Sequence, residues 1–337
     1  KLSGVWIMAY TDIDDPSAVF QTKLYTGNGT DDTAITFDGN SDLQPALIWI
    51  KNRDTTDAHH WVSVPGTGVE KRLRTNTTGA LGDQDDGVKS IQSNGFTIGT
   101  TGSLNENGEA IVAWSWKETA GVCDIVTYTG NGGGRTISHN LGSVPKVMWT
   151  KNLVRTTNWG SYHVAVGAGK DAGYLNNNVV PEANTNFWNN TEPTSSVFSV
   201  GSDNTYNKNA EAYAAYLFGN KQGVSKMGNY VGNGNVNGTF VHTGFKPAMV
   251  IVKRFDGADN WTLADNKRPG YNSSQDTLYP NENSAEVTST NWVDFLSNGF
   301  KLLRTDGAEN ANGATYFYLA FAEQPFVTST GVPATAR

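Results

Sequence analysis

Three tryptophans in this chain have the type and spacing that could build repeated binding sites. Trp61, Trp159 and Trp261 follow one another at intervals of 98 and 102 residues (159 − 61 and 261 − 159). An indole ring can stack on the face of a sugar, and it can equally fill the core of a small domain. Because the three recur at comparable places in one chain, we favour the core, with sugar stacking as the alternative.

Aromatic residues without counterparts elsewhere in the chain are better candidates for contacts with a ligand. They are Tyr162, Tyr174, Trp188 and Tyr271. Each offers an apolar ring face together with a polar N–H or O–H. Trp188 and Trp292 both precede a strand built around a phenylalanine, so packing stays open for this pair.

Glycine-rich turns also recur, and their composition suggests a loop that could cradle a phosphate. They are Gly27-Asn-Gly29, Gly130-Asn-Gly-Gly-Gly134 and Gly232-Asn-Gly234. A phosphate loop continues into Gly-Lys-Ser/Thr or into a helix, and neither pattern follows here. Glycine and asparagine accept a positive φ at little cost, so the motif predicts tight turns and no cofactor.

Histidines give only a weak indication of a metal or catalytic site. His59 and His60 are adjacent but have no counterparts further along the chain, and His139, His163 and His242 are scattered. No serine lies in a Gly-x-Ser-x-Gly motif. We therefore predict neither metal ligands nor catalytic residues among these side chains.

Two acidic segments, Asp83–Gly87 and Asp256–Asp259, offer the oxygen ligands that calcium prefers, but without the spacing of a calcium loop. Solvated turns are the favoured interpretation. A carboxylate pair for glycoside hydrolysis is defined by its separation in space, which the sequence does not reveal. No Asp or Glu recurs in all three of the repeats described below, which favours a protein that is not an enzyme.

Composition narrows the function classes further. Lys and Arg number 25 against 32 Asp and Glu, which gives a net charge of −7. Nucleic-acid-binding faces are basic, so we expect no nucleic-acid partner. The longest apolar runs, such as Ala46–Ile50 and Tyr316–Ala322, fall far short of the ~20 residues of a membrane helix, so we expect no membrane insertion. Cys123 is the single cysteine, which excludes an internal disulfide.

Five short patterns recur in the same order and indicate that the chain repeats itself three times. They are a Tyr-x-Gly-Asn-Gly turn beginning at Tyr25, Tyr128 and Tyr230, a Pro-led strand ending in Lys at 45–51, 145–151 and 247–253, the three tryptophans, Leu-x-x-Asn at Leu73/Asn76, Leu175/Asn178 and Leu278/Asn281, and a Phe strand at 95–98, 197–200 and 299–302. Each copy closes with an asparagine turn at Asn107, Asn209 or Asn312 and then an aromatic strand ending at Trp116, Phe218 or Phe321.

The elements that carry these patterns are short apolar runs bounded by Gly, Asn, Pro and Asp, which favours strands joined by turns. We predict an all-β protein of three tandem β-sandwich or jelly-roll-like repeats of about 100 residues. The expected boundaries are an N-terminal arm or end of an upstream unit at 1–23, repeats at 24–119, 120–220 and 221–324, and a C-terminal extended arm at 325–337. Trp149 and Phe198 are predicted core residues. Beads in a row and packing about a pseudo-threefold axis both remain open.

The chain resembles a family of tailed-bacteriophage virion proteins, which are tail-fibre-like structural proteins with repeated β units. The stretches that carry the resemblance are 20–29, 194–198, 228–234, 243–248, 294–302 and 314–323, with the segment that runs on to Arg337. The similarity extends over nearly the whole chain from about residue 16. It implies a structural component exposed on the surface of a phage particle.

This resemblance implies a tail fibre or receptor-binding component that contacts the host cell surface. Its expected partners are other virion proteins, further copies of itself (a trimer by analogy) and a host surface glycan. Non-adhesive capsid decoration is the alternative, in which the terminal arms dock on neighbouring subunits. A fibre-borne glycan depolymerase is the third hypothesis. The family offers no catalytic residues to carry over, and which residues bind ligand is unknown at this point.

Overall fold

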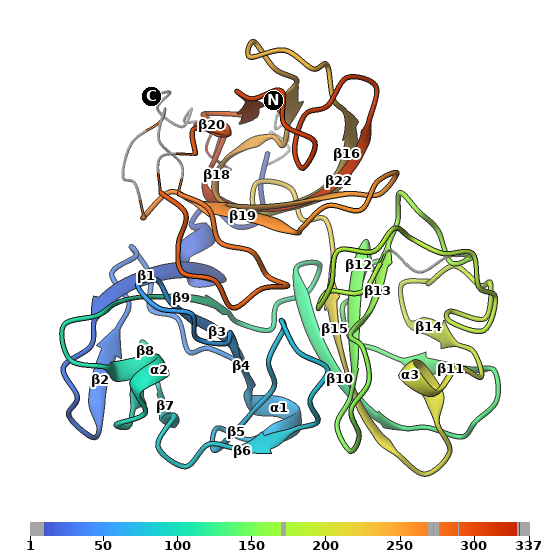
Figure 1. Ribbon diagram of the computed structural model, residues 1–337, viewed down its shortest axis with the longest axis horizontal. Coiled ribbons are helices and arrows are strands. Elements are labelled where there is room, and N and C mark those ends of the chain that lie inside the picture. The colour runs from blue at the N-terminus through green and yellow to red at the C-terminus, as the bar shows by residue number, and fades with distance from the viewer. Residues whose placement is uncertain are drawn as a thin grey trace, which may run out of the picture.

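The fold is built almost entirely from antiparallel β-strands (Figure 1). The computed structural model describes residues 10–169, 173–268, 272, 276–288, 290–328 and 330. The predicted all-β class is therefore confirmed. We call the segments 20–116, 123–218 and 225–325 the first, second and third unit, because each contains one four-stranded sheet.

The strands follow one another in a similar order in each unit. In the first unit they are β1 (Phe20–Thr26), β2 (Thr33–Thr36), β3 (Leu47–Asn52), β4 (His60–Ser63), β5 (Lys71–Arg72), β6 (Gly82–Asp83), β7 (Val88–Gln92), β8 (Gly95–Ile98) and β9 (Ala110–Trp116). In the second they are β10 (Cys123–Thr129), β11 (Arg135–Ser138), β12 (Val147–Asn152), β13 (Gly160–His163), β14 (Val197–Val200) and β15 (Ala212–Phe218). In the third they are β16 (Ser225–Val231), β17 (Phe240–His242), β18 (Phe245–Arg254), β19 (Thr262–Asp265), β20 (Val293–Leu296), β21 (Gly299–Leu302) and β22 (Thr315–Pro325).

Helices are limited to single turns in the described residues. They are η1 (Pro16–Ala18), α1 (Val64–Thr67), α2 (Gly102–Asn105) and α3 (Asn204–Asn207). None of them has the length and apolar character that crossing a membrane requires.

The four-stranded sheets share one topology. Their orders are β1-β9-β3-β4, β10-β15-β12-β13 and β16-β22-β18-β19, so in each sheet the first and the last long strand of the unit lie side by side. The pairing register is equivalent as well, because Phe20, Cys123 and Ser225 face Trp116, Phe218 and Phe321 respectively. The recurring sequence patterns thus correspond to recurring strand positions.

A smaller sheet covers the outer face of each four-stranded sheet. These outer sheets have the orders β2-β8-β7, β11-β14 and β17-β21-β20. Alternate residues of the inner strands point into the space between the two sheets, as the period of a strand requires. In β3, for example, Ile48 and Ile50 join the core formed with Ile35 and Phe96 of the outer sheet. Each unit is therefore a β-sandwich with its own core, and Phe198 is buried in that of the second unit.

The opposite faces of the three inner sheets pack against one another around a common centre (Figure 1). The final aromatic residues of the three closing strands, Trp116, Phe218 and Phe321, form a triangle there. Their ring centroids lie 6.1 Å (Trp116 to Phe218), 5.5 Å (Trp116 to Phe321) and 5.8 Å (Phe218 to Phe321) apart. Trp149 is buried in this central core, as predicted. The units are thus packed around a pseudo-threefold axis rather than strung as beads.

The tryptophan pattern is out of register with the strands. Trp61 pairs across its hairpin with Trp49, and the matching partners in the other units are Ser161 and Leu263, not Trp159 and Trp261. The true counterpart of Trp159 and Trp261 is His59, two residues before Trp61. The prediction that the three tryptophans are equivalent was therefore wrong for Trp61. Its strand position is two residues later than that of Trp159 and Trp261 in their own units.

The rings of His59, Trp159 and Trp261 connect the three units in a cycle of hydrogen bonds. Nε1–H of Trp159 donates to the carbonyl of Arg74 in the first unit at 2.9 Å, and Nε1–H of Trp261 donates to Tyr174 in the second unit at 3.2 Å. His59 Nε2 lies 3.0 Å from the carbonyl of Tyr279 in the third unit. Each unit therefore bonds to the one before it, and the first unit bonds to the last.

The backbone N–H at each of these positions is also held by an asparagine. Asn76, Asn176 and Asn281 accept from the amides of His59, Trp159 and Trp261 at 3.2, 2.7 and 2.9 Å. In the second unit the asparagine that does this is Asn176, two residues before the Asn178 that the sequence pattern selected. The Leu-x-x-Asn pattern therefore holds in two units and is shifted in the other.

A buried asparagine fixes each Tyr-x-Gly-Asn-Gly turn. Asn105, Asn207 and Asn310 are fully buried, and their Oδ1 atoms accept from the amides of Asn28, Asn131 and Asn233 at 2.9, 2.9 and 3.0 Å. The hydroxyls of Tyr25, Tyr128 and Tyr230 donate to the carbonyl just before that asparagine, at 2.9, 2.6 and 2.6 Å. We call this arrangement the asparagine latch.

The first glycine of each turn is required by the latch. A Cβ on Gly27, Gly130 or Gly232 would lie 2.1, 2.2 or 2.3 Å from a backbone carbonyl oxygen of the opposing loop. Only glycine allows two backbones to approach this closely. The glycine turns are structural elements that pack against the end of α2, α3 and the corresponding segment of the third unit.

Candidate functional site

Because the first unit bonds to the last, the three units form a closed ring. Three clefts lined by polar residues lie at equivalent junctions between these units. The first is lined by Gln21, Asp38 and Asn40 of the first unit together with Ala322–Gln324 of the third. The second combines Asp124 and Asn140 with the linker residues 118–120, and the third combines Lys226 and 242–244 with residues 220–223. Each cleft thus lies between the end of one unit and the first strand of the next. We call them the 3–1, 1–2 and 2–3 clefts.

The 3–1 cleft, of about 210 Å³, is formed by two units that are not consecutive in the chain. Its lining is completed by Ser17, Phe20, Thr22, Gly39, Ala248, Asn266 and Lys267. Since a water molecule takes about 30 Å³ in the liquid, the space accommodates several waters or one small organic molecule. Phe20 stacks on Phe321 with ring centroids 5.1 Å apart, which holds the two units together beneath the cleft.

One wall of the 3–1 cleft is positioned by Gln21, which is almost fully buried. Its Nε2 donates to the carbonyls of Ser17 and Ser41, both at 2.8 Å, and its Oε1 accepts from the amide of Gly39 at 2.8 Å. All hydrogen-bonding groups of this side chain are thereby used in holding the 38–41 loop. A satisfied buried amide of this kind rigidifies the segment that it bridges.

Asp38 joins the two units across the mouth of the cleft. Its carboxylate lies 3.1 Å from Lys23 Nζ of the same unit and 3.5 Å from Lys267 Nζ of the third. Partial burial raises the pKa of Asp38, but the hydrogen bond and ion pair with Lys23 and the charge of Lys267 outweigh it and lower that pKa below its usual value. The carboxylate therefore stays ionised at neutral pH.

The other wall is positioned by the turn after β19. Asp265 Oδ1 accepts from the amides of Lys267 and Arg268 at 3.0 and 3.1 Å, which fixes the segment that presents Asn266 and Lys267. The amide of Asn266 donates to Ala248 at 2.8 Å. Asp265 itself is fully buried, so its charge needs a partner beneath the cleft.

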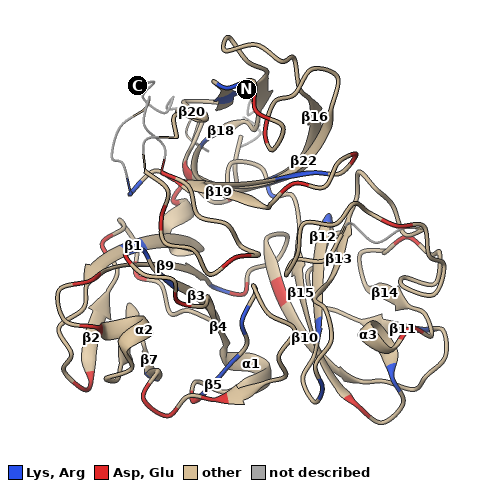
Figure 2. Ribbon diagram, viewed as in Figure 1, with Lys and Arg blue, Asp and Glu red and all other residues tan. Residues whose placement is uncertain are grey.

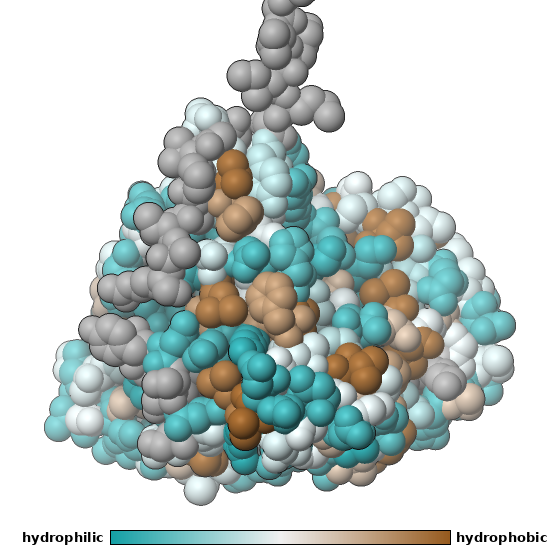
Figure 3. Space-filling model, turned by 90° about the horizontal axis from the view of Figure 1, so that it is seen from above, coloured by the Kyte–Doolittle hydropathy of each residue, from teal (hydrophilic) through white to brown (hydrophobic). Residues whose placement is uncertain are grey.

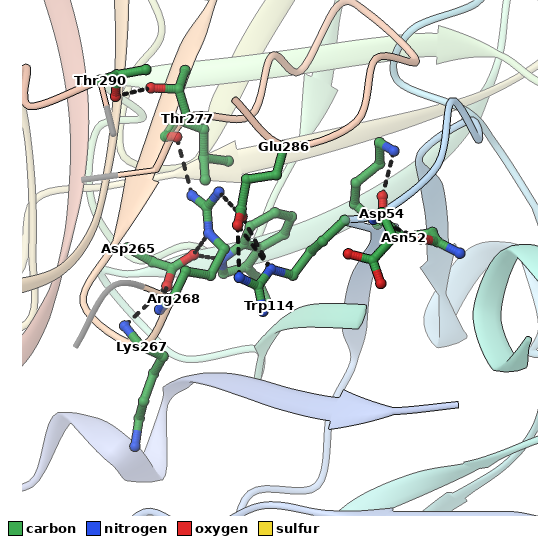
Figure 4. Close-up of polar contacts among 12 residues, drawn as sticks. Asn52, Asp54, Trp114, Asp265, Lys267, Arg268, Thr277, Glu286 and Thr290 are labelled. Atoms are coloured by element: carbon green, nitrogen blue, oxygen red, sulfur yellow. Dashed lines mark hydrogen bonds and ion pairs between the residues drawn. The ribbon is translucent and has the colours of Figure 1, made fainter. Parts of the chain in front are cut away.

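That partner is Arg268, which lies in a buried ion network between the third and first units (Figure 4). Arg268 Nε donates to Asp265 Oδ2 at 2.6 Å, and its Nη1 donates to Glu286 Oε2 at 2.7 Å. Glu286 also pairs with Arg53 of the first unit at 2.6 Å. Trp114 completes the network, because its Nε1–H donates to Asp265 at 3.1 Å and its ring lies 5.8 Å from the Arg268 guanidinium.

Charge compensation explains the ionisation states in this network. Burial raises the pKa of Glu286, but the hydrogen bond from Arg53 and the charge of Arg268 more than reverse this, so its pKa is lowered. Burial lowers the pKa of Arg268, and the charges of Asp265 and Glu286 raise it above its ordinary value. The network therefore stays charged in the interior and ties the turn after β19 to Trp114 and Arg53 of the first unit.

The corresponding junction between the first and second units is apolar. There the amide of Leu81 donates to the carbonyl of Leu153 at 3.1 Å, just as the amide of Glu286 donates to Arg53 at 2.8 Å. Leu81 and Leu153 pack against the central core. The third and first units thus meet through ions at positions where the first and second meet through leucines.

Each unit also buries one lysine at the end of its Pro-led strand. Nζ of Lys51, Lys151 and Lys253 donates to the carbonyl of the following residue. Burial lowers the pKa of each of these ammonium groups to about 8. They hold the loops that follow the strands, and the described structure places no carboxylate in an ion pair with them.

The aromatic candidates for ligand contact are largely interior. Trp61, Trp159 and Trp261 are buried in the central core, as favoured from the sequence. Tyr162 and Trp188 are only 1% and 0% exposed and lie in the core of the second unit, so their selection as ligand-contacting residues was wrong.

Two further aromatic positions complete this set. Tyr174 is half-buried and contacts the ring of Phe187, and Tyr271 lies outside the described residues. Trp292, for which packing was left open, is fully buried in the core of the third unit. A single copy of an aromatic residue proved a poor indicator of exposure, because each sandwich core is filled by its own set of rings.

The acidic segments are held by neighbouring cations and amides. Asp83 pairs with Lys71 at 2.7 Å. Arg254 pairs with both Asp256 and Asp259, at 2.7 and 3.3 Å. Among the described residues, no group of three or more His, Cys, Asp and Glu side chains is placed to hold a metal ion.

Four of the five histidines and the cysteine are buried, although Cys123 lines the 1–2 cleft and the exposed His242 lines the 2–3 cleft. Burial lowers the pKa of His59 and His163 to about 3 and that of His60 further below its ordinary value. Neutral His59 accepts from Trp49 Nε1 at 2.9 Å through Nδ1, which leaves Nε2–H to bond Tyr279. Burial raises the pKa of the Cys123 thiol, which keeps it protonated.

Charge is spread thinly over the three units. Figure 2 shows Lys and Arg distributed among all of them, with Asp and Glu at several loop tips around the periphery. From the side seen in Figure 3, hydrophilic residues predominate and hydrophobic ones form small separate patches.

Two sets of structurally important residues were not found from the sequence. The latch asparagines lie two residues before the Asn107, Asn209 and Asn312 that were noticed, and they recur at the same spacing. That recurrence was a sufficient signal. The Arg53, Asp265, Arg268 and Glu286 network has no counterpart in the other units, so no repeat pattern could indicate it.

Comparison with known families gives one match. A family described as a domain of unknown function, DUF7483, matches residues 15–325, which include all three units and, apart from Tyr10, the residues that line the junction clefts. No curated protein matches the chain. Since this family model spans nearly the whole ring, the chain belongs to the DUF7483 family.

Proposed function

We propose that the protein is a non-enzymatic component of a bacteriophage virion, most plausibly a tail fibre or receptor-binding subunit that attaches the particle to a host cell. The resemblance of the sequence to phage virion proteins supports the proposal that the protein is part of a phage particle. The observation that carries attachment is the set of polar clefts at the junctions of one closed ring. Expected partners are other virion proteins, further copies of the chain and a host surface glycan.

The construction of the ring suits such a role. A shared aromatic core and cyclic hydrogen bonds hold the clefts in fixed relative positions. Rigid sites lose little entropy on binding. Many copies on a particle would raise avidity well above the affinity of one site. Weak individual sites would therefore be sufficient for adsorption.

Two observations favour attachment over the alternatives. Capsid decoration requires terminal segments that reach neighbouring subunits, yet residues 10–15 pack on the same chain: Asp12 pairs at 2.6 Å with Lys221 in the linker before the third unit, and Asp15 accepts from the hydroxyl of Ser41 in the first unit. The outer parts of both arms, 1–9 and 331–337, lie outside the described residues. A depolymerase needs a carboxylic acid with a raised pKa. The pKa of Asp38 in the 3–1 cleft is lowered, which argues against catalysis in that cleft, whereas burial raises the pKa of Glu118 in the 1–2 cleft.

Electron cryomicroscopy of the intact particle tests this proposal. We expect density for the ring at the tail tip or along fibres, in a copy number that is a multiple of three. Density spread over the capsid lattice would contradict attachment and support decoration. Absence of the protein from purified particles, judged by mass spectrometry of the same preparation, would contradict a virion role altogether.

A further inference from the structure

We infer that the 3–1 cleft is a saccharide subsite, in which side-chain amides from two units bind the hydroxyl groups of a single sugar ring. This inference rests on the proposed attachment function and deepens it by naming the site and the ligand chemistry. It follows from the hydrogen-bond state of the residues that line the three clefts.

Three primary amides in the 3–1 cleft are free to bind a ligand. Among the described residues, the side chains of Asn40, Asn266 and Gln324 have no hydrogen-bond partner, although they line one space of about 210 Å³. Asn40 and Gln324 are exposed at its rim, and Asn266 is half-buried. An amide can donate and accept at once, as can a sugar hydroxyl, so the two match in every orientation of the hydroxyl.

Among the described residues, the other two clefts each have one side-chain amide without a partner, Asn140 in the 1–2 cleft and Gln222 in the 2–3 cleft, and use several of their other polar groups internally. In the 1–2 cleft, Asp124 accepts from the amide of Asn140 at 2.7 Å and Glu118 accepts from the amide of Ile125 at 3.0 Å. In the 2–3 cleft, Asn220 bonds the backbone of Met227 in both directions. The 3–1 cleft therefore differs from its counterparts because, within the described part of the chain, three side-chain amides without partners line it, against one in each of the others.

The walls that carry these amides are already rigid. Gln21 holds the loop of Asn40, and Asp265 holds the turn of Asn266. Asp38 pairs with both Lys23 and Lys267, and Glu323, the other carboxylate in the lining, pairs with Lys246, so neither carboxylate is left for a cation. A preorganised cavity of this size with three unpartnered amides suits a polyhydroxylated ring better than a metal ion.

The experiment is saturation-transfer NMR on the full chain, followed by titration with the methyl glycosides of glucose, galactose, mannose and N-acetylglucosamine at up to tens of millimolar. We expect at least one glycoside to bind with a dissociation constant in the millimolar range. Asn266→Ala and Asn40→Ala should each weaken that binding roughly five-fold, as the loss of about one neutral hydrogen bond implies. Thermal unfolding of each variant checks that it is folded.

Gln222→Ala is the matched control, because it removes an exposed amide from the 2–3 cleft. It should leave the affinity unchanged. If Asn40→Ala and Asn266→Ala both bind as tightly as the parent chain, the subsite is elsewhere, and the attachment function stands. If none of the four glycosides binds, the saccharide assignment is overturned, while particle localisation decides the proposed function independently.

Discussion

Replacing one latch asparagine by alanine should destabilise the whole ring. Asn105 Oδ1 accepts from the amide of Asn28 at 2.9 Å, and its Nδ2 donates to the carbonyls of Thr30 and Gly99, both at 2.8 Å. Asn105→Ala strands these three backbone groups at a fully buried position. Each unsatisfied buried group costs about 1–3 kcal/mol, and water can reach the exposed Thr30, so we expect a loss of about 3 kcal/mol in the free energy of unfolding.

The repeats supply replicates and controls for this measurement. Asn207→Ala and Asn310→Ala remove the same bonds from the other units and should cost about as much. Asn107, which lies two residues after Asn105, is exposed, and Asn107→Ala should change the free energy by less than about 0.5 kcal/mol. Urea titrations followed by tryptophan fluorescence give all of these values on one scale.

The shape of the transition tests the reasoning as much as the magnitude does. Because the three units share the central core, a change in one latch should shift a single transition for the whole chain. Losses below about 1 kcal/mol at all three positions would refute the account of the latch. A transition that splits, with one unit unfolding first, would refute the account of the shared core.

Three further predictions test other parts of the structure. Glu286→Leu removes the carboxylate partner of half-buried Arg53 and one of the two carboxylate partners of buried Arg268, and it should cost about 3–5 kcal/mol. The double variant with Arg53→Leu imitates the leucine junction and should recover part of this loss in urea titrations; equal losses would refute the ionic account. Trp149→Ala should cost about 3–5 kcal/mol in the same assay, and a near-neutral result would contradict its place in the central core. Burial raises the pKa of Glu309 to about 7, above the value of about 4.5 expected in the unfolded chain. Between these two pH values the folded chain binds a proton that the unfolded chain has released. The free energy of unfolding should therefore fall by about 1.4 kcal/mol per pH unit as pH rises from about 4.5 to 7. Glu309→Gln should flatten that fall in pH-dependent melting curves and Glu106→Gln, at an exposed position, should not; an unchanged slope in Glu309→Gln would show that this carboxyl titrates normally.

The sequence predicted those parts of the fold that recur. Strand positions followed from Pro-led apolar runs and asparagine turns, because each unit must build the same sheet from local signals. The sequence comparison missed that His59 occupies the position of Trp159 and Trp261, because it searched for the same residue type in each unit. The three units share the position of this residue and its ability to form a hydrogen bond, but not its type. Both imidazole and indole can donate a ring N–H to a neighbouring carbonyl.

The site was much less accessible from the sequence. The 3–1 cleft combines residues near positions 21–40 with residues near 266 and 324, and no local pattern links segments so far apart. Tyr162 and Trp188 were selected because they have no counterparts in the other units, but both rings pack in the core of the second unit. Free amides in a cleft are visible only once their lack of partners can be established in three dimensions.

The closure of the ring has a consequence for chain connectivity. The third and first units are joined by a ring–carbonyl hydrogen bond equivalent to those of the consecutive pairs. The amide of Phe326 donates to the carbonyl of Gly244 at 3.2 Å, and Tyr10 lines the same cleft as Gly244. Succession along the polypeptide is therefore not needed to hold any one interface. A circular permutant that is opened in the 117–122 linker, with a short peptide joining the segments near Phe326 and Tyr10, should fold to the same ring, with the 3–1 cleft then formed by consecutive units.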